Sequence, residues 1–271
     1  MFNLFGSAKF KSALGLDLSD ISLKFIQLEK NAGNFNTLAY SDEVIPKEIM
    51  DSSTIKDPKG MVRIIQNAVA QPKFGHISTR FVTASIPETK CFVRVISMAA
   101  VSEEEAAEAV PWESEAYIPM PINQVYLDWV ILPSPGVAKD KMKVLITAAP
   151  KDYVDNYTRI LKEAGLTPVA LEIESQAIAR SLVTGSSETI LMLDIDTIRT
   201  SFIIYDEGTL EFTSSIPIAG AMFTAELAKA LGMDIVEAEK LKRTSGLDPA
   251  LDRGRVKKAL APVIKNLAQE T

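Results

Sequence analysis

The chain has 271 residues, 47% hydrophobic and 24% charged, which is the composition of an ordinary globular protein with one large or two medium-sized domains. Its formal charge of −6 and its lack of a basic run argue against a nucleic-acid binder. Cys91 and His76 are the only cysteine and histidine, which excludes a disulfide framework, a zinc site and a Cys-His nucleophile. No apolar run approaches the roughly 20 residues that span a bilayer.

The first twelve residues, MFNLFGSAKFKS, combine the large apolar side chains of Phe2, Leu4, Phe5 and Phe10 with two lysines, Lys9 and Lys11. They are too few and too polar for a signal peptide. Contact with a membrane surface is one interpretation. A frayed terminus fits better, so we expect residues 1–12 to form a tail.

The strongest pattern is a repeat of a strand, a tight turn and a second strand. LGLDLSDISLKFIQL at residues 14–28 aligns without gaps with LMLDIDTIRTSFIIY at residues 191–205, and Asp17 then falls on Asp194. Each copy continues through another turn into a third strand with alternating polar and apolar residues. Two copies so far apart predict two similar domains that face each other.

The two predicted turns are rich in hydroxyl and backbone N–H groups, which can cradle phosphate oxygens. An aspartate at each turn can hold a magnesium ion through the waters that this ion retains. The arrangement resembles the actin-like ATPase fold shared by actin, hexokinase and the Hsp70 chaperones. The alternative is two unrelated buried hairpins whose aspartates merely start turns.

The remaining elements follow in chain order. After the first three strands, Asp57 and a first-turn proline predict a helix, and the strand 81–86 completes a βββαβ unit. Ser102 and Glu105 form a capping box for a helix that we expect Pro111 to kink and Pro119 to end. The segments 125–132 and 142–149 are predicted strands, 151–164 a helix, 168–173 a strand and 175–183 a helix. Beyond the second repeat we expect three helices, the last over residues 256–268 with a kink or late start at Pro262.

This order predicts an α/β protein made of duplicated βββαβα domains, ribonuclease H-like, with an inserted α+β subdomain. We assign residues 1–12 to the tail, 13–87 to domain 1, 88–168 to the insert, 169–186 to the return to domain 1 with an interdomain helix, and 187–271 to domain 2. An actin-like second domain normally carries more strands and a Gly-rich turn that contacts adenosine. We therefore expect domain 2 to be incomplete at its C-terminal side.

Several segments together resemble the PilM family, the actin-like proteins of type IV pilus assembly. They are GLDLSDISLKFIQLEK, WESEAYIPMPINQVYLDW, the stretch from LITAAPKDY to SQAIAR, and LMLDID with the helices that follow. The resemblance implies an insert like that of FtsA, ATP and magnesium bound between the domains, and a site for the cytoplasmic tail of the membrane protein PilN. It also implies other pilus platform partners, possible homo-oligomers, and a cytoplasmic place at the inner face of the membrane.

The family pattern implies functional residues at matching positions. Asp17 and Asp194 would face the metal ion through water, and Lys24 would reach the terminal phosphates, although an ordinary edge-strand lysine fits as well. Glu174, at the start of the interdomain helix, is a weak catalytic candidate for orienting water, and an acid favoured by the helix dipole is the simpler interpretation. The implied nucleotide-binding set is Asp17, Ser19, Asp20, Ser22, Lys24, Asp194, Asp196, Thr197 and Thr200.

Two departures from the family pattern affect nucleotide binding. The usual Asp-x-Gly of each turn is Asp17-Leu18-Ser19 here, and Asp194-Ile195-Asp196 in the second copy. Glycine lets the backbone approach phosphate and adopt positive φ, whereas Asp196 puts a negative charge beside a polyphosphate. Because phosphoryl transfer depends on positioned charge, we expect weak nucleotide binding with little or no hydrolysis.

The predicted partner-binding residues lie in or near the insert: Trp112, Tyr117, Ile118 and Trp129. Most apolar residues there should be core, while a few would line a groove for an extended tail, with added-strand pairing as one mode. Two alternatives stay open, an FtsA-like cell-division protein and a weak ATPase of the actin and hexokinase superfamily. The WESEAYIPMP segment favours PilM, and no residue stands out as the acid base that a kinase relative needs.

Overall fold

The computed structural model describes residues 2–3, 12–31, 33–51, 53–133, 138, 140–183, 188–206 and 208–270. The chain divides into two compact units. The first contains Met1–Thr189 with Tyr205–Phe212, and the second contains Ile190–Ile204 with Thr213–Thr271. Within the described part of the chain, no helix is both long and apolar enough to cross a membrane.

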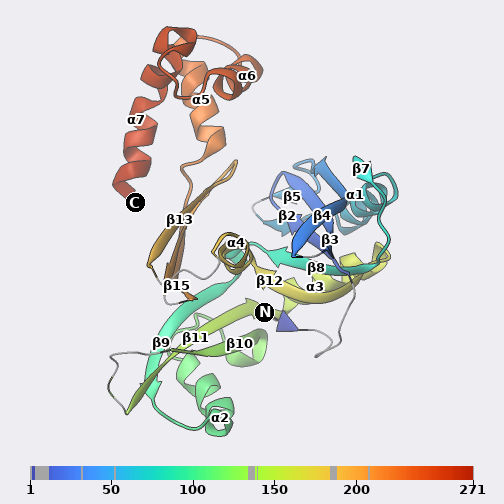
Figure 1. The fold of residues 1–271 in the computed structure, drawn as a ribbon, viewed down its shortest axis with the longest axis vertical. Helices are drawn as coiled ribbons and strands as arrows, with labels where there is room; N and C mark the ends of the chain where they lie inside the picture. Colours follow the sequence, from blue (N-terminus) through green and yellow to red (C-terminus); the bar gives the residue numbers. More distant parts are fainter. Residues whose placement is uncertain are drawn as a thin grey trace. The chain divides into compact units, whose positions relative to one another are not determined.

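A seven-stranded sheet organises the first unit (Figure 1). Strands β12, β8 and β2 run parallel, and β2, β3 and β4 form an antiparallel meander, which confirms the predicted hairpin and third strand. In spatial order the strands are β1 (Phe2–Asn3), β12 (Thr167–Ile173), β8 (Phe81–Ile86), β2 (Leu14–Leu18), β3 (Ser22–Asn31), β4 (Asn34–Val44) and β7 (Phe74–Gly75). A small hairpin of β5 (Met50–Asp51) and β6 (Thr54–Ile55) lies between β4 and the first helix in the chain.

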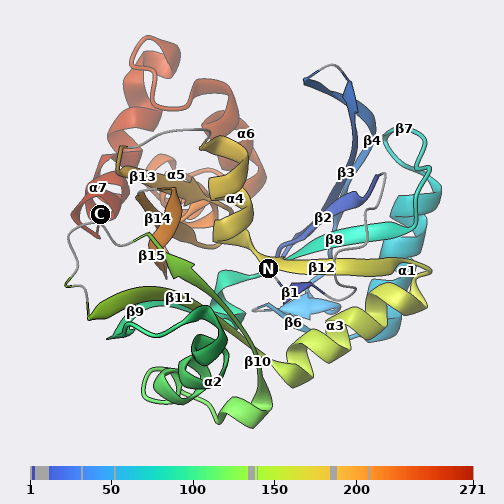
Figure 2. The same cartoon turned by 60° about the horizontal axis from the view of Figure 1, so that its bottom comes forward.

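One face of this sheet holds the main core. Alternate residues of β2, namely Leu14, Leu16 and Leu18, are buried against α1 (Pro58–Ala70) and α3 (Lys151–Glu163), which lie on the same side of the sheet (Figure 2). Each fully buried leucine contributes about 2 kcal/mol by leaving water. Asp57 occupies the N-cap position of α1, as predicted, but its side chain makes no capping hydrogen bond.

Residues 88–150, the first part of the predicted insert, contain a three-stranded antiparallel sheet and an α-helix. Helix α3, also within the predicted 88–168, packs in the core of the main sheet, so "the insert" below means residues 88–150. Its strands β9 (Phe92–Ala99), β10 (Val125–Leu132) and β11 (Lys141–Pro150) pair in the order β10-β11-β9. The short helices η1 (Glu88–Lys90) and η2 (Ile122–Gln124) flank it in the chain. Helix α2 (Glu103–Ser114) begins at the predicted capping box, in which the Glu105 N–H donates to Ser102 Oγ at 3.2 Å.

Two expectations were wrong, one for the end of α2 and one for the N-terminal tail. Helix α2 passes through Pro111 and stops at Ser114, where the Ser114 carbonyl accepts from the N–H groups of Tyr117 and Ile118, so Pro119 does not end it. Phe2–Asn3 pairs with Leu171 and Ala170 of β12 as a short added strand, so this part of the tail is not frayed.

Helix α4 (Glu174–Leu182) leaves the end of β12, and an ion pair from its Arg180 to the buried Glu172 ties it to that strand. The second repeat forms a sheet in the order β13-β14-β15, made of β13 (Ile190–Ile195), β14 (Thr200–Asp206) and β15 (Thr209–Ile216).

Three helices follow in the second unit: α5 (Gly220–Leu231), α6 (Ile235–Ser245) and α7 (Arg255–Glu270), with η3 (Leu251–Gly254) before the last. Leu227, Ala238, Val256 and Leu260 form the centre of their core. The Asp234 carboxylate caps α6 by accepting from the N–H groups of Val236 and Glu237. Helix α7 begins at Arg255, well before Pro262, so the proline is not a late start.

Candidate functional site

In the first unit, the predicted acidic residues gather at one edge of the sheet. The parallel strands β2, β8 and β12 end at this edge, and ligands of open α/β sheets bind outside such strand ends. Asp17 is the penultimate residue of β2, and Glu174 follows directly after β12. Between them Ser85, on β8, donates its hydroxyl to the Asp17 carboxylate at 2.7 Å. This bond orients Asp17 at the edge.

Lys24 lies beside Asp17 on the neighbouring strand. It pairs directly with Asp17 in the ladder between β2 and β3, and with Asp42 in the ladder between β3 and β4. Directly opposed residues in antiparallel strands share one face, about 5 Å apart at Cβ. The exposed Lys24 side chain is therefore the cation nearest in register to the predicted metal-facing acid.

The turn between β2 and β3 is closed by its own serines. The Ser19 N–H donates to the Ser22 carbonyl at 2.9 Å, and the Ser22 N–H donates to Ser19 Oγ at 3.2 Å. The two hydroxyls are also 3.0 Å apart. Neither serine has positive φ, so this turn does not require the glycine that the family pattern carries at position 19. Both backbone N–H groups are thus committed within the turn.

Asp20 bonds to the β5–β6 hairpin through its side chain. Its buried carboxylate accepts a hydrogen bond from the Ser53 N–H and lies 3.4 Å from Ser53 Oγ. Ser53, in the β5–β6 hairpin, has a φ of 56°, a left-handed conformation uncommon for serine. Thr89 Oγ1 donates to Ser53 Oγ at 3.2 Å. Asp20 therefore joins the turn to the small hairpin and to η1.

Glu174 stands at the start of α4, where the helix dipole favours an acid. One of its carboxylate oxygens lies 3.4 Å from the Glu88 N–H. Burial and the charges of Glu88 and Glu174 raise the pKa of Cys91, so its thiol stays protonated and unreactive. Burial, Tyr153, Asp17 and Glu174 similarly raise the pKa of Tyr157. In both groups burial is the larger cause, and the charge of Glu174 adds to it.

In the second unit, the turn after β13 is held through its backbone. The Asp196 N–H donates to the Arg199 carbonyl at 3.0 Å and closes the turn. The Asp196 and Thr197 carbonyls accept from Gly220 and Ala221, the first two residues of α5, at 2.9 and 2.7 Å. A Cβ on Gly220 would lie 3.2 Å from the Asp196 carbonyl oxygen, which explains the glycine.

The four predicted residues of this second site differ in accessibility. Asp194, Asp196 and Thr197 are half-buried along the end of β13 and the turn. Thr200 is fully buried and donates its hydroxyl to the Ile218 carbonyl at 2.6 Å. Its hydroxyl therefore serves the fold and is not directed at a ligand.

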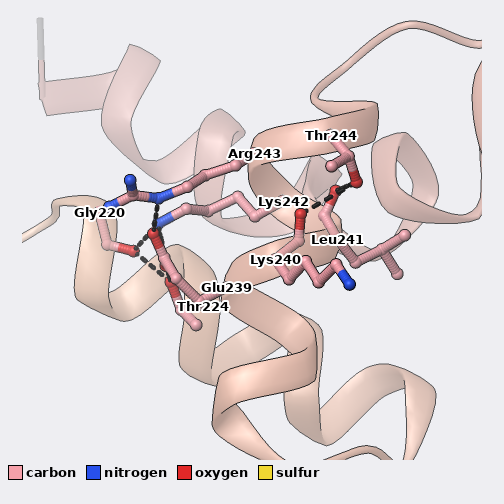
Figure 3. A network of polar contacts seen from close by, with 8 residues as sticks. All are labelled: Gly220, Thr224, Glu239, Lys240, Leu241, Lys242, Arg243 and Thr244. Carbon is pink, nitrogen blue, oxygen red and sulfur yellow. Dashed lines mark hydrogen bonds and ion pairs between the residues drawn. The ribbon is translucent and has the colours of Figure 1, made fainter.

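A polar network supports the start of α5 (Figure 3). Lys242 Nζ donates to the Gly220 carbonyl at 3.0 Å and to Thr224 Oγ1 at 2.8 Å, and forms an ion pair with Glu239 at 2.7 Å. Arg243 Nε binds the other Glu239 oxygen at 2.6 Å. Lys242, then Thr224 and Arg243, lower the pKa of Glu239 to about 2. Lys242 thus binds the carbonyl of Gly220, the residue whose N–H donates to the Asp196 carbonyl.

The residues suit magnesium only through water. Among the described residues, no three acidic, histidine or cysteine side chains are placed to hold a metal ion directly. Asp17 and Asp194 are the predicted metal-facing acids, and magnesium keeps most of its water shell when bound through one or two carboxylates. Magnesium would supply the positive charge that a polyphosphate needs beside the acids of the first unit.

The four predicted partner residues also differ. Trp112, on α2, is 76% exposed, whereas Ile118 is buried in the core of the insert. Tyr117 is half-buried beneath Arg94, whose guanidinium carbon lies 5.0 Å from the ring centre. Trp129 packs its half-buried ring against the same core. Only Trp112 has the exposure of an anchor.

Two pockets meet near these residues. One, of about 380 Å³, lies between the β5–β6 hairpin, the start of α3 and the insert, and is lined by Thr54, Ile55, Lys90, Met120, Pro150, Asp152, Tyr153 and Asn156. We call it the hairpin pocket. The second, the proline groove, is lined by Glu115, Ile118, Pro119, Met120, Pro121, Ile122 and Asn123. Met120 lines both.

Sequence reasoning missed three residues that shape these sites: Ser53, Ser85 and Lys242. Ser85 and Ser53 lie 68 and 33 residues from the aspartates they contact, and a serine at a strand end or in a turn gives no distinctive signal. For Lys242 a signal exists, because Glu239 is spaced three and four residues from Lys242 and Arg243, which is typical of an ion-pair network on one helix face. This spacing does not predict the contact of Lys242 with Gly220.

Comparison with known proteins identifies the family and the fold. A family model described as type IV pilus assembly protein PilM matches residues 15–271. A solved PilM-PilN type IV pilus biogenesis complex is 25% identical, with a TM-score of 0.77 over 97% of this chain and 76% of that chain. The cell division protein FtsA of Escherichia coli K12 is 25% identical over 222 residues, 74% of this chain, and the chain spans about half (53%) of it.

More distant structures share the fold alone. EutJ of Carboxydothermus hydrogenoformans has a TM-score of 0.58 at 16% identity over 97% of this chain and 70% of its own. MreB5 of Spiroplasma citri bound to AMPPNP has a TM-score of 0.54 at 13% identity over 97% of this chain and 78% of its own. The predicted actin-like ATPase fold is thereby confirmed. With a family match over almost its entire length, the chain belongs to the PilM family of type IV pilus assembly proteins.

Proposed function

We propose that this chain is a scaffold of the type IV pilus machine, held at the inner face of the membrane by the cytoplasmic tail of a PilN-like protein. The observation that carries this proposal is the hairpin pocket. Ile55, Met120 and Tyr153 give it apolar walls, and Lys90 and Asp152 give it a polar rim. Pockets of this kind, with few polar groups at fixed places, suit short extended peptides.

The walls of the hairpin pocket are anchored on both sides. Lys90 Nζ donates to Thr54 Oγ1 at 3.0 Å and ties η1 to the β5–β6 hairpin. On the other side, Lys151 Nζ donates to the Asn123 carbonyl at 2.9 Å and ties α3 to the insert. A preformed pocket lowers the entropy cost of binding a disordered tail.

Filling the pocket tests the proposal. Thr54 is exposed on a strand, so Thr54→Trp should fold and reduce binding of a synthetic PilN-like tail peptide at least tenfold in a fluorescence anisotropy titration. Thr37→Trp, also exposed on a strand but outside the pocket, is the matched control and should bind normally. Equal affinities for both variants would exclude this pocket as the tail site.

We further propose that nucleotide binds weakly, with magnesium, at the two aspartate turns. In the first unit Asp17 and Lys24 offer one oriented acid and one exposed cation, and in the second the half-buried Asp194 and Asp196 lie at the end of β13 and in the turn after it. The committed N–H groups of Ser19 and Ser22 remove donors that would otherwise cradle phosphate. Glu174, at the start of α4, is the residue that the family pattern implies for orienting water.

Calorimetric titration with Mg-ATP tests this second part. The unaltered chain should bind, and Asp17→Ala and Asp194→Ala should each abolish the signal, because each removes one magnesium-facing acid. No heat from the unaltered chain, with the tail peptide still bound, would leave an adaptor without nucleotide. The FtsA match keeps a cell-division-like role as the alternative, which capture of an FtsA partner in place of the PilN-like tail would favour.

A further inference from the structure

Helix α2 has an unusual charge distribution. Residues 103–115 contain six glutamates and no lysine or arginine, a surplus equal to the whole chain's formal charge of −6. Glu103, Glu104 and Glu105 are explained by the fold, because they occupy the first turn, where the dipole favours acids, and Glu105 completes the capping box. The other three need another account.

Those three acids, Glu108, Glu113 and Glu115, lie around Trp112. Glu113 and Glu115 fall at the C-terminal end of the helix, where negative charge is unfavourable and where no basic residue offsets it. All three are exposed, and none takes part in an ion pair within the described residues. The fold gains nothing from this charge.

The geometry turns these residues into one surface. Residues three and four apart on a helix are neighbours, so Glu108 and Glu115 flank Trp112 on either side along the helix. Glu115 keeps helical angles, with φ of −59° and ψ of −29°, although it lies just after the last helical residue. An indole face between two carboxylates is suited to a guanidinium or ammonium group, which it binds by cation–π attraction and by charge.

This surface continues into the tail site. Glu115 also lines the proline groove, whose other walls include Ile118, Met120 and Ile122, and Met120 is shared with the hairpin pocket. Glu115 therefore belongs both to this surface and to the proline groove, and it lies three residues after Trp112 in the chain.

We propose that Trp112, Glu108 and Glu115 bind an arginine or lysine of the PilN-like tail, on the side of the tail nearer the membrane. This rests on the proposed tail docking and adds its chemistry. Cytoplasmic segments close to a membrane span carry an excess of lysine and arginine, which an acidic, tryptophan-bearing helix complements. The same charge repels anionic lipid headgroups and nucleic acid, so the occupant is a basic peptide segment.

The test is a double-mutant cycle on tail binding. The probes are a synthetic peptide of the complete PilN-like tail and a copy with citrulline for arginine and acetyl-lysine for lysine. Trp112→Ala should weaken the natural peptide about tenfold, and Glu108→Gln with Glu115→Gln about threefold with a flatter salt dependence. Neither variant should further weaken the neutral peptide, because the partner charge is already gone.

Controls separate the possible failures. Glu226→Gln with Glu270→Gln removes two exposed acids from the second unit and should leave affinity unchanged. If the natural peptide binds but is indifferent to the Trp112 and glutamate changes, the basic site is overturned and the hairpin pocket stands. If the peptide does not bind the unaltered chain at all, both the tail docking and the basic site are overturned.

Discussion

The turn after β2 and the turn after β13 come from the same repeat, yet they are held by different parts of the chain. In the first unit, serine hydroxyls close the turn and the Asp20 carboxylate ties it to the β5–β6 hairpin. In the second unit, backbone carbonyls of Asp196 and Thr197 dock on the start of α5. Both turns share one backbone bond, from Ser19 to Ser22 in the first and from Asp196 to Arg199 in the second, and they differ in the added support, which comes from side chains in the first turn and from backbone contacts with α5 in the second.

This difference decides which side chains can meet a ligand. The polar residues of the first turn, Ser19 and Asp20, are buried in bonds that maintain the fold. Those of the second turn, Asp196 and Thr197, stay half-buried because the backbone already holds the turn. Substitutions that remove the support of one turn at a time test this difference.

The largest effect is expected for Asp20→Ala. The substitution leaves the buried Ser53 N–H without its charged acceptor, which should cost about 3 kcal/mol. Urea unfolding followed by tryptophan fluorescence measures this loss, since both tryptophans, Trp112 and Trp129, belong to the first unit. The aligned residue of the second repeat is Thr197, and Thr197→Ala should cost under about 1 kcal/mol. Similar losses for the two would contradict the comparison.

Lys242→Met should destabilise the second unit by about 2 kcal/mol. It removes the donor to the Gly220 carbonyl and to Thr224, and leaves Glu239 with Arg243 as its remaining basic partner in Figure 3. Hydrogen exchange of α5 measures the effect. Lys240→Met is the matched control, because this neighbouring lysine is exposed and should leave exchange unchanged. Equal protection in both variants would show that α5 holds the turn without Lys242.

Restoring glycine should affect the two turns differently. Asp196→Gly removes a charge beside the proposed phosphate position and should tighten Mg-ATP binding about tenfold, or roughly 1.4 kcal/mol. Ser19→Gly removes the hydroxyl that accepts from the Ser22 N–H, so it loosens the first turn and should bring no gain. Calorimetric titration compares them. Tighter binding with Ser19→Gly than with Asp196→Gly would reverse the assignment of roles.

The sequence predicted what local patterns determine. Alternation in residues 14–28 gave the hairpin of β2 and β3, and the spacing from Ser102 to Glu105 gave the start of α2, because these signals lie within a few residues of one another. The repeat placed Asp17 and Asp194 at equivalent strand ends. Strand ends and helix starts can therefore be predicted from one sequence.

Contacts between residues far apart in the chain could not be predicted from the sequence. Asp20 was predicted to bind a ligand because it lies in a polar turn. Its carboxylate instead accepts a hydrogen bond from the Ser53 N–H, in a hairpin that no sequence pattern predicted. Thr200 looked like a phosphate contact, yet its hydroxyl goes to Ile218. A polar side chain in a turn can bond to another part of the protein or to a ligand. Which of the two occurs depends on the residues that the fold brings next to it.

The smallest expected effect is a pH dependence confined to the second unit. Because the folded state lowers the pKa of Glu239 from 4.5 to about 2, its ionised form stabilises the fold above about pH 4.5. That stability is lost as the pH falls from 4.5 toward 2, and for a partly exposed carboxylate it amounts to about 1 kcal/mol. Hydrogen exchange of α5 at pH 5 and pH 3 measures the loss, and Glu239→Gln should reduce it. A loss of the same size in Glu239→Gln would assign the acid sensitivity to another carboxylate and remove Glu239 from the support of the second turn.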